Sequence, residues 1–434
     1  MRSAYAEMAR KRRLPVVPRT APIRTEEPVR TPERPVRGGP HALDAAEGPR
    51  GVAEYHGPVS TQQRRELPIV EQAAAVHALA VDAHTAARIA PDVASGPPLD
   101  ALGRRLHDLR ISVTDRCNFR CVYCMPKEVF GKDFAFLPRD QVLSFEEIER
   151  LARIFVGMGV EKLRITGGEP LVRRDLPDLI EGLAQIRRPD GGPVDLTLTT
   201  NGAALRSLAQ PLRDAGLQRI TISLDSLDPD VFGAMNGVDF PVSRVLEGIA
   251  AARHAGLAPI KINTVIRRDL NEASILPMAR WARDEGLILR FIEYMDVGHS
   301  NGWRMDDVVP EAEILARIDA EMPLEAIAPN YAGEVATRWR YVDGSGEVGV
   351  IASVSEPFCS SCTRARLSAE GKLYTCLFAV AGHDLRALLR SDRTDDQIEA
   401  AVRGVWRLRD DRYSDLRTEA TTALPKVEMF AMGG

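Results

Sequence analysis

Residues 108–128 of the chain, DLRISVTDRCNFRCVYCMPKE, place three cysteines immediately after a run of strand length. Cys117, Cys121 and Cys124 lie within eight residues, and the loop holds no fourth cysteine. A structural zinc ion takes four protein ligands, whereas a [4Fe-4S] cluster bound through three thiolates keeps one iron free for another molecule. The spacing therefore predicts a metal centre, either an open iron–sulfur cluster or a zinc ion completed by a distant ligand.

The run after residue 108 is the first of several apolar runs of strand length, separated by stretches of helical periodicity. The first helical stretch begins at Ser144, with Glu147 three residues later as a capping box. Alternating strands and helices are typical of a parallel sheet. We predict an α/β fold with a partial (β/α)6 TIM-type barrel; an open doubly wound sheet is the alternative. The predicted strands are 108–115, 162–168, 195–202, 219–225, 259–266 and 288–295.

A glycine followed by an apolar residue precedes four of these strands, at Gly159, Gly216, Gly256 and Gly286. Glycine suits the left-handed position that ends a helix, and the apolar residue can pack back on the last turn. Because chemistry in such folds lies at the C-terminal ends of the strands, we expect the first cysteine loop to belong to the active site.

The composition is that of a globular protein: 434 residues, 44% of them hydrophobic, with a formal net charge of −4. The chain has no run of about 18 apolar residues and no signal-peptide core, so we expect a cytoplasmic protein that does not enter a membrane. The balanced charge gives no indication of nucleic-acid binding. All six cysteines lie in two groups, which in a reducing compartment indicates metal binding before disulfides.

Residues 1–101 differ from the rest. They are rich in Pro, Arg and Ala and contain no cysteine, so we expect a disordered extension. The Arg-rich start also suits an organelle transit peptide, although Pro15, Pro18 and Pro22 interrupt the amphipathic helix that such peptides form.

The second predicted strand runs into Gly167-Gly168-Glu169-Pro170, a glycine pair able to expose backbone groups to a zwitterionic ligand. The CxxxCxxC loop followed by GGEP resembles the radical S-adenosylmethionine (SAM) superfamily. The resemblance implies that the open iron binds the amino and carboxylate groups of SAM, and that one electron cleaves SAM to a 5′-deoxyadenosyl radical. The positions that match the SAM contacts of the superfamily are Tyr123, Gly168, Ser223 and Met295.

A second group of three cysteines, Cys359, Cys362 and Cys376, again lacks a fourth member, with zinc as the alternative to a cluster. With the first group it resembles the GTP 3′,8-cyclase family of molybdenum cofactor biosynthesis, in which a second [4Fe-4S] cluster faces the substrate. The resemblance extends from about residue 102 to residue 434. It includes RISVTDRCNFRCVYCMPKE, RITGGEPLVRRDL, FIEYMDVG, NGW, FCSSCTRARLSAEGKLYTCLF, RDDRYSD and the terminal Gly433-Gly434, a tail that enters the active site in that family.

Cations in or beside the predicted strands point to an anionic ligand, because a buried cation is costly unless an anion meets it. Arg364 and Arg366 follow the second cysteine pair at i and i+2, and side chains two apart on an extended segment point to the same side. The alternative is internal pairing with acids such as Glu169 or Glu293. The sequence has no P-loop. Positions matching the family's GTP contacts are Arg110, Arg164, Thr199, Lys261, Arg364 and Arg366, of which we expect the last two to be catalytic.

The resemblance implies a radical SAM lyase with two [4Fe-4S] clusters and SAM as cofactors. The radical removes the 3′ hydrogen of GTP, and the C3′ radical attacks C8 to give (8S)-3′,8-cyclo-7,8-dihydroguanosine 5′-triphosphate. We expect a barrel over residues 102–325 and a cluster- and substrate-binding region over 326–434. Expected partners are an electron donor, a downstream pyranopterin-forming enzyme and a second copy of the chain in a homodimer.

Two other functions fit part of the pattern. An iron–sulfur electron carrier explains the cysteines but gives no role to GGEP or to the arginines. A radical SAM enzyme that modifies a peptide also fits, although its auxiliary regions usually contain more than three cysteines.

Overall fold

The computed structural model of the chain describes residues 96–433, and the predictions for residues 1–95 and for Gly434 lie outside this range. Part of the predicted extension is described, and there Asp100 is buried and forms ion pairs with Arg104 and Arg409. Packed structure therefore begins before residue 102, because these pairs tie the segment to the C-terminal region. No helix in the described range is long and apolar enough to cross a membrane.

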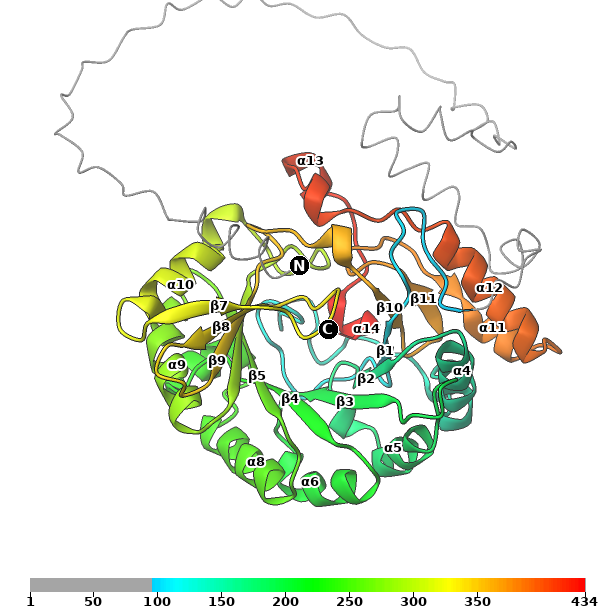
Figure 1. The fold of residues 1–434 in the computed structure, drawn as a ribbon, viewed down its shortest axis with the longest axis horizontal. Helices are drawn as coiled ribbons and strands as arrows, with labels where there is room; N and C mark the ends of the chain where they lie inside the picture. Colours follow the sequence, from blue (N-terminus) through cyan, green and yellow to red (C-terminus); the bar gives the residue numbers. More distant parts are fainter. Residues whose placement is uncertain (1–95, 434) are drawn as a thin grey trace, which may run out of the picture. The chain divides into compact units, whose positions relative to one another are not determined.

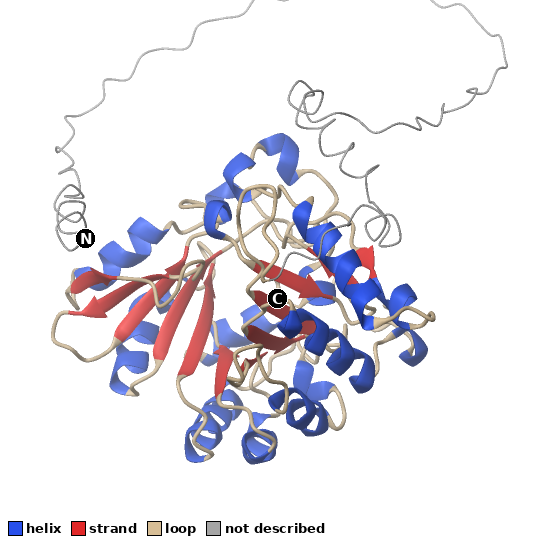
Figure 2. Cartoon of the chain, turned by 45° about the vertical axis from the view of Figure 1, so that its right-hand side comes forward, coloured by secondary structure: helices blue, strands red, loops and turns tan. Residues whose placement is uncertain are grey.

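The six predicted strands form and lie side by side in chain order, each parallel to the next. They curve around an open centre, with the helices on their outer side (Figures 1 and 2). This arrangement confirms the partial barrel over the doubly wound sheet, which would carry helices on both faces. The strands are β1 (Asp108–Ser112), β2 (Lys162–Thr166), β3 (Asp195–Thr200), β4 (Arg219–Ser223), β5 (Ile260–Ile266) and β6 (Ile288–Glu293).

The first helix begins, and four of the helices end, where the sequence predicts. Ser144 and Glu147 form the capping box of the first helix. The four glycines that precede strands all have positive φ, as a left-handed helix end requires. The helices are α4 (Phe145–Gly157), α5 (Leu176–Ala184), α6 (Leu205–Asp214), α7 (Pro229–Asn236), α8 (Val242–His254), α9 (Ile275–Asp284) and α10 (Glu311–Asp319).

Helix α4 shows how the outer layer is held to the sheet. Ile148, Leu151 and Phe155 recur at helical spacing and are fully buried in one continuous core with the strands. Burying side chains of this size stabilises the fold by roughly 1.5–3 kcal/mol each. The polar inner face of the sheet is thereby left to line a cavity.

The C-terminal region extends the sheet at both edges, which the sequence did not predict. Strand β10 pairs in parallel with β1, and β9 pairs in parallel with β6, so the strand order is β12-β11-β10-β1-β2-β3-β4-β5-β6-β9-β8-β7. The sheet is therefore continuous across the boundary expected near residue 325, which remains a prediction. These strands are β7 (Leu324–Ile327), β8 (Thr337–Tyr341), β9 (Glu347–Ile351), β10 (Arg364–Leu367), β11 (Lys372–Tyr374) and β12 (His383–Asp384).

Short helices complete the C-terminal region. They are α11 (Leu385–Leu389), α12 (Asp395–Arg407), α13 (Glu419–Thr422) and α14 (Met429–Met432), and α14 lies inside the ring of strands in Figure 1. Single 3₁₀ turns occur at Arg139–Gln141, Pro170–Val172, Glu272–Ser274, Met305–Asp307, Cys359–Ser361 and Ser414–Leu416.

Candidate functional site

A cavity of about 680 Å³ lies on the inner face of the sheet. It takes its walls from all six barrel strands, from both cysteine loops and from the C-terminal segment. The structure brings every site residue predicted from the sequence to this one cavity. These residues are Arg110, Cys117, Cys121, Tyr123, Cys124, Arg164, Gly168, Thr199, Ser223, Lys261, Met295, Cys359, Cys362, Arg364, Arg366 and Cys376.

The first cysteine loop is held in shape by its own arginine. The side chain of Arg120 donates hydrogen bonds to the carbonyls of Cys117 and Phe130, at 2.8 and 2.6 Å. Its backbone amide donates to the carbonyl of Asn236 at the end of α7. The three thiols therefore sit on a loop with a defined course, and none of them forms a disulfide.

The GGEP turn packs directly on this loop. The amide of Gly168 donates to the Thr114 carbonyl at 2.7 Å, and the amide of Glu169 donates to the Arg116 carbonyl at 2.8 Å. A Cβ at Gly168 would lie 2.4 Å from the Arg116 oxygen, so only glycine allows this approach. The expectation that GGEP exposes its amides is therefore wrong for these two residues, because their N–H groups are used inside the protein.

Acidic side chains lie beside the first loop. The hydroxyl of Tyr123 donates to Asp225 at 3.0 Å, and burial raises the pKa of Asp225 to about 7. Glu169 is also buried, which raises its pKa to about 7. Burial and the neighbouring Glu169 raise the pKa of the Cys117 thiol to about 12. The environment therefore favours a positively charged occupant.

The second cysteine loop has the opposite surroundings. A guanidinium nitrogen of Arg364 lies 3.6 Å from the Cys362 sulfur, and Arg409 donates to the Cys362 carbonyl at 3.0 Å. Burial alone would raise the pKa of Cys362, but Arg364 and Arg409 lower it to about 7. The thiolate that metal ligation requires is therefore favoured at Cys362, whereas burial raises the pKa of Cys359, and burial and Asp411 raise the pKa of Cys376.

The donor set fits two iron–sulfur clusters. Each loop presents three free thiols to the same cavity. Within residues 96–433, no three His, Cys, Asp or Glu side chains converge as ligands of one metal ion. Ligands of a cube bind different irons and lie further apart, so this spread suits clusters. The cysteines that would hold them are Cys117, Cys121 and Cys124 for the first and Cys359, Cys362 and Cys376 for the second.

Two rows of side chains cross the strands on the cavity wall, two residues apart along each strand. The first row is Arg364, Asp108, Lys162 and Asp195, and the second is Arg366, Arg110 and Arg164. Charges alternate in the first row, so it is balanced within the protein. The second row holds three cations on strands spaced about 4.8 Å apart, with no carboxylate between them. Like charges in this arrangement repel unless an anion joins them.

The pKa values of Arg110, Arg366 and Lys261 are lowered by burial and by the neighbouring positive charges. Burial, together with Arg366 and Arg164, lowers the pKa of Arg110 well below its usual value. Burial and Arg364 lower the pKa of Arg366 to about 9, and burial and Arg290 lower the pKa of Lys261 to about 8. Within the described range, the side chains of Arg110 and Lys261 have no hydrogen-bond or ion-pair partner.

The alternative pairing with Glu169 or Glu293 is wrong. Glu169 accepts hydrogen bonds from the amides of Leu171 and Asn201 and from the Thr200 hydroxyl. Glu293 accepts from backbone amides, including those of Val354 and Ser355. Both carboxylates are satisfied by neutral donors, which leaves the arginine row uncompensated.

The structure adds residues that the sequence analysis did not place in the site. Arg290 lines the cavity, and its Nε is buried without a partner in the described chain. Tyr331, in the loop between β7 and β8, accepts a hydrogen bond from Lys162 at 3.0 Å. A cation inside an apolar strand could have identified Arg290. No sequence pattern marks Tyr331, because its loop meets β2 only in the folded chain.

The C-terminal tail enters the cavity, as expected, as far as the described residues extend. The carbonyl of Gly433 accepts a hydrogen bond from Arg366 at 2.6 Å. A Cβ at Gly433 would lie 1.9 Å from the Thr166 hydroxyl oxygen, and its φ of 73° is in the left-handed region. Both observations require glycine at this position.

Comparisons with known proteins divide the chain in the same way as the two cysteine loops. Residues 111–282 match the Radical SAM superfamily, and residues 287–415 match the family Molybdenum Cofactor Synthesis C. The GTP 3′,8-cyclase of Acidothermus cellulolyticus is 57% identical over 325 residues, which is 74% of this chain and 89% of that protein. The GTP 3′,8-cyclase of Staphylococcus carnosus is 49% identical over 339 residues, 77% of this chain and 98% of that protein.

The chain belongs to the GTP 3′,8-cyclase family. As a member of this family it is a radical SAM enzyme, and its cofactors are SAM and [4Fe-4S] clusters. Among solved structures, Streptococcus suis SuiB resembles the chain in fold, with 15% identity, a TM-score of 0.44 and coverage of 73% of this chain and 69% of that chain.

Proposed function

We propose that this member of the GTP 3′,8-cyclase family cyclises GTP to (8S)-3′,8-cyclo-7,8-dihydroguanosine 5′-triphosphate in the cavity between its two cysteine loops. This reaction is the first step of molybdenum cofactor biosynthesis. The main observation that supports a GTP site here is the row of Arg366, Arg110 and Arg164 beside the second loop, whose charges no carboxylate within residues 96–433 compensates. A triphosphate supplies the negative charge that the row lacks.

The row and its neighbours bind the phosphates. Guanidinium groups offer paired donors that match phosphate oxygens, and their charge persists at neutral pH. Thr199 accepts a hydrogen bond from Arg164 at 2.8 Å and so fixes the direction of that guanidinium. Lys261 on β5 faces the cavity three strands from Arg164 and adds a further charge.

SAM binds beside the first loop, where Tyr123, Gly168, Ser223 and Met295 line the cavity. The acidic surroundings of that loop suit the positive sulfonium and ammonium groups of SAM. Cys117, Cys121 and Cys124 would hold the first cluster, which together with SAM would supply the carbon radical needed to take a hydrogen atom from C3′ of GTP. The cavity wall holds ribose and base in one orientation and excludes water, so that C3′ meets C8 before solvent.

Arg364 and Arg366 have the catalytic positions in this proposal. Arg364 lies between the Cys362 sulfur and the ring of Phe358, whose centroid is 5.2 Å from its guanidinium carbon. Its Nε is buried without a partner within residues 96–433 and is free for a substrate atom. Arg366 is the member of the arginine row that lies beside Arg110, and it also donates a hydrogen bond to the Gly433 carbonyl.

Anaerobic incubation of the reconstituted protein with GTP, SAM and a reductant tests the proposal, with the product identified by mass and NMR. We expect the cyclic triphosphate from the wild-type chain. Arg364→Ala and Arg366→Ala should abolish it while leaving the iron content of both clusters unchanged. The exposed Arg340, which pairs with Glu325 on the surface, provides the control Arg340→Ala. Normal turnover by either site variant would refute its catalytic role.

The remaining partners follow from the reaction. Cleavage of SAM consumes an electron, so a one-electron donor must reach the first loop. The product passes to a pyranopterin-forming enzyme, and we place the reaction in the cytoplasm, with the chain acting as a homodimer. Gel filtration with light scattering tests the dimer, and a monomeric mass would contradict it.

A further inference from the structure

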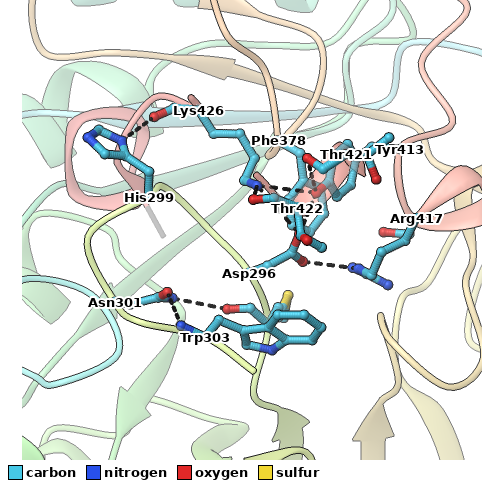
Figure 3. A network of polar contacts seen from close by, with 12 residues as sticks. Asp296, His299, Asn301, Trp303, Phe378, Tyr413, Arg417, Thr421, Thr422 and Lys426 are labelled. Carbon is cyan, nitrogen blue, oxygen red and sulfur yellow. Dashed lines mark hydrogen bonds and ion pairs between the residues drawn. The ribbon is translucent and has the colours of Figure 1, made fainter. Parts of the chain in front are cut away.

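A buried cluster of charged side chains joins the loop after β6 to the C-terminal segment (Figure 3). Asp296 directly follows Met295, and its side chain is 4% exposed. Its carboxylate lies 3.0 Å from the Arg417 Nε and 3.5 Å from the Lys426 Nζ. It also accepts a hydrogen bond from the Tyr413 hydroxyl. One carboxylate thus compensates two buried cations.

The same two cations also form hydrogen bonds within the C-terminal segment and to the barrel. Lys426 donates to the Tyr413 hydroxyl at 3.2 Å and to the Thr422 carbonyl at 3.0 Å. Arg417 donates to the Ser353 carbonyl at 2.8 Å, next to β9. Residues 413–426 are therefore wrapped around Asp296 and tied to the barrel through it (Figure 3).

The cluster contacts the second cysteine loop through aromatic rings. Tyr413 stacks on Phe378, with ring centroids 4.3 Å apart and planes 16° apart. The amide of Phe378 in turn donates to the Cys376 sulfur at 3.5 Å. The position of Tyr413 is thus coupled to a thiol of the second loop.

The first cysteine loop is connected through Asn301. Its side-chain amide donates to the carbonyls of Met295 and Tyr123, at 3.1 and 3.3 Å. Tyr123 lies between Cys121 and Cys124, so the loop that carries Asp296 is fastened to the first loop as well. The two cysteine loops are therefore joined by one network, in which the Asp296 carboxylate pairs with both Arg417 and Lys426.

Lys426 is a charged anchor close to the point where the chain enters the cavity, and Glu428 is a second one, which accepts a hydrogen bond from the His299 amide at 3.2 Å. Beyond it, the ring of Phe430 packs on Phe130 of the first loop region, with centroids 5.0 Å apart. Gly433 then reaches Arg366. Loss of the Lys426 contact would weaken the hold on residues 413–426, leaving the stretch beyond them to the contacts of Glu428, Phe430 and Gly433 and making the cavity more accessible to water.

We propose that Asp296 is a positioning residue that holds residues 413–433 across the cavity and fixes Met295 and Cys376 relative to each other. The inference rests on the proposed function, because it assigns Asp296 a part in shielding the GTP reaction. Without its charge, Arg417 and Lys426 become buried like charges, and the segment moves out to hydrate them.

Limited trypsin digestion of the full chain tests the anchoring without any turnover. The Lys426 side chain is 1% exposed, and cleavage after it releases the octapeptide VEMFAMGG, which mass spectrometry detects. We expect Asp296→Asn to release this peptide at least about tenfold faster than the wild-type chain. The matched control is Asp306→Asn, because Asp306 is exposed on the same connecting segment. Equal release from Asp296→Asn and the control would overturn the proposal.

A double variant separates loss of charge balance from general misfolding. Asp296→Asn/Lys426→Met returns the cluster to the net charge of the wild type, with one cation fewer. We expect it to regain much of the protection against cleavage after Arg417 that Asp296→Asn loses. A double variant that is cleaved as fast as the single one would contradict the electrostatic basis of the anchoring.

The positioning role has its own measurement, the ratio of 5′-deoxyadenosine formed to GTP cyclised. At unchanged iron content, Asp296→Asn should raise this ratio severalfold, because an open cavity lets solvent quench the radical. A released tail with an unchanged ratio would overturn the positioning role. A wild-type chain that makes no cyclic product would overturn the proposed function, and the trypsin comparison would still decide the anchoring.

Discussion

The two cysteine loops present the same number of thiols to one cavity, but the charges beside Cys117 and Cys121 of the first loop are opposite in sign to those beside Cys362 of the second. Beside the first loop, burial raises the pKa values of Cys117 and Cys121, and the charges of Glu169 and Asp225 add to this effect. Beside the second, Arg364 and Arg409 bring the pKa of Cys362 down to about 7. The difference matches the ligands of the proposed reaction, because SAM carries a cationic centre and GTP is a polyanion.

The largest effect should come from removing a thiol from one loop at a time. Cys124→Ala should abolish both cleavage of SAM and cyclisation of GTP, because no cluster would bind SAM. Cys362→Ala should abolish cyclisation but leave reductive cleavage of SAM. Quantifying 5′-deoxyadenosine and the cyclic product in both variants checks this, and equal loss of SAM cleavage in the two would erase the distinction between the loops.

Removing one member of the arginine row should act on GTP alone. Truncating one partner of a buried charge pair costs about 2–5 kcal/mol, so Arg110→Ala should weaken GTP binding at least about thirtyfold. The affinity for SAM should stay within about twofold. Anaerobic calorimetry with each ligand measures both values, and a matching loss of SAM affinity would show that the row is structural.

The pH dependence of GTP binding should follow Lys261. Its pKa in the free protein is about 8, lowered from 10.5 by burial and by Arg290, and a bound triphosphate raises it. The charge of Lys261 therefore contributes fully to GTP affinity below pH 7. The affinity falls as the pH rises through 8, by about tenfold at pH 9. In Lys261→Arg the fall should largely vanish, since arginine stays charged. A fall of equal size in this variant would exclude Lys261 as its cause.

The smallest effect should come from removing the charge of Asp225, beside the first cysteine loop. Asp225→Asn keeps an acceptor for the Tyr123 hydroxyl but removes the negative charge, which should weaken SAM binding by roughly three- to tenfold. GTP binding should be unchanged. Equilibrium dialysis under anaerobic conditions measures the two, and stronger SAM binding by the variant would reverse the assigned charge preference.

Local patterns in the sequence predicted the local structure. The capping box at Ser144, the glycine at each helix end and the alternation of runs gave the barrel strands and helices, because each depends on residues close in the chain. The six cysteines and the cations on the strands also marked the cavity. What could not be predicted depends on register between distant segments. Arg366 lies beside Arg110 only because β10 pairs with β1, and no nearby residue encodes that pairing.

The cluster around Asp296 was missed for the same reason. Asp296, Tyr413 and Lys426 have no shared spacing, and a carboxylate near a basic tail resembles any surface ion pair in the sequence. Only burial and the folded course of the chain show that these side chains meet. The charge difference between the thiols of the two loops likewise arises from residues that are far apart in the sequence, such as Glu169, Asp225 and Arg409.

The most direct test of the account uses GTP labelled with deuterium at C3′, incubated anaerobically with the reconstituted chain, SAM and a reductant. The account predicts that deuterium appears in 5′-deoxyadenosine, together with an equal amount of the cyclic triphosphate. Formation of 5′-deoxyadenosine without deuterium, at a rate indifferent to GTP, would contradict it, because the two ligands would then not meet in the cavity between the loops.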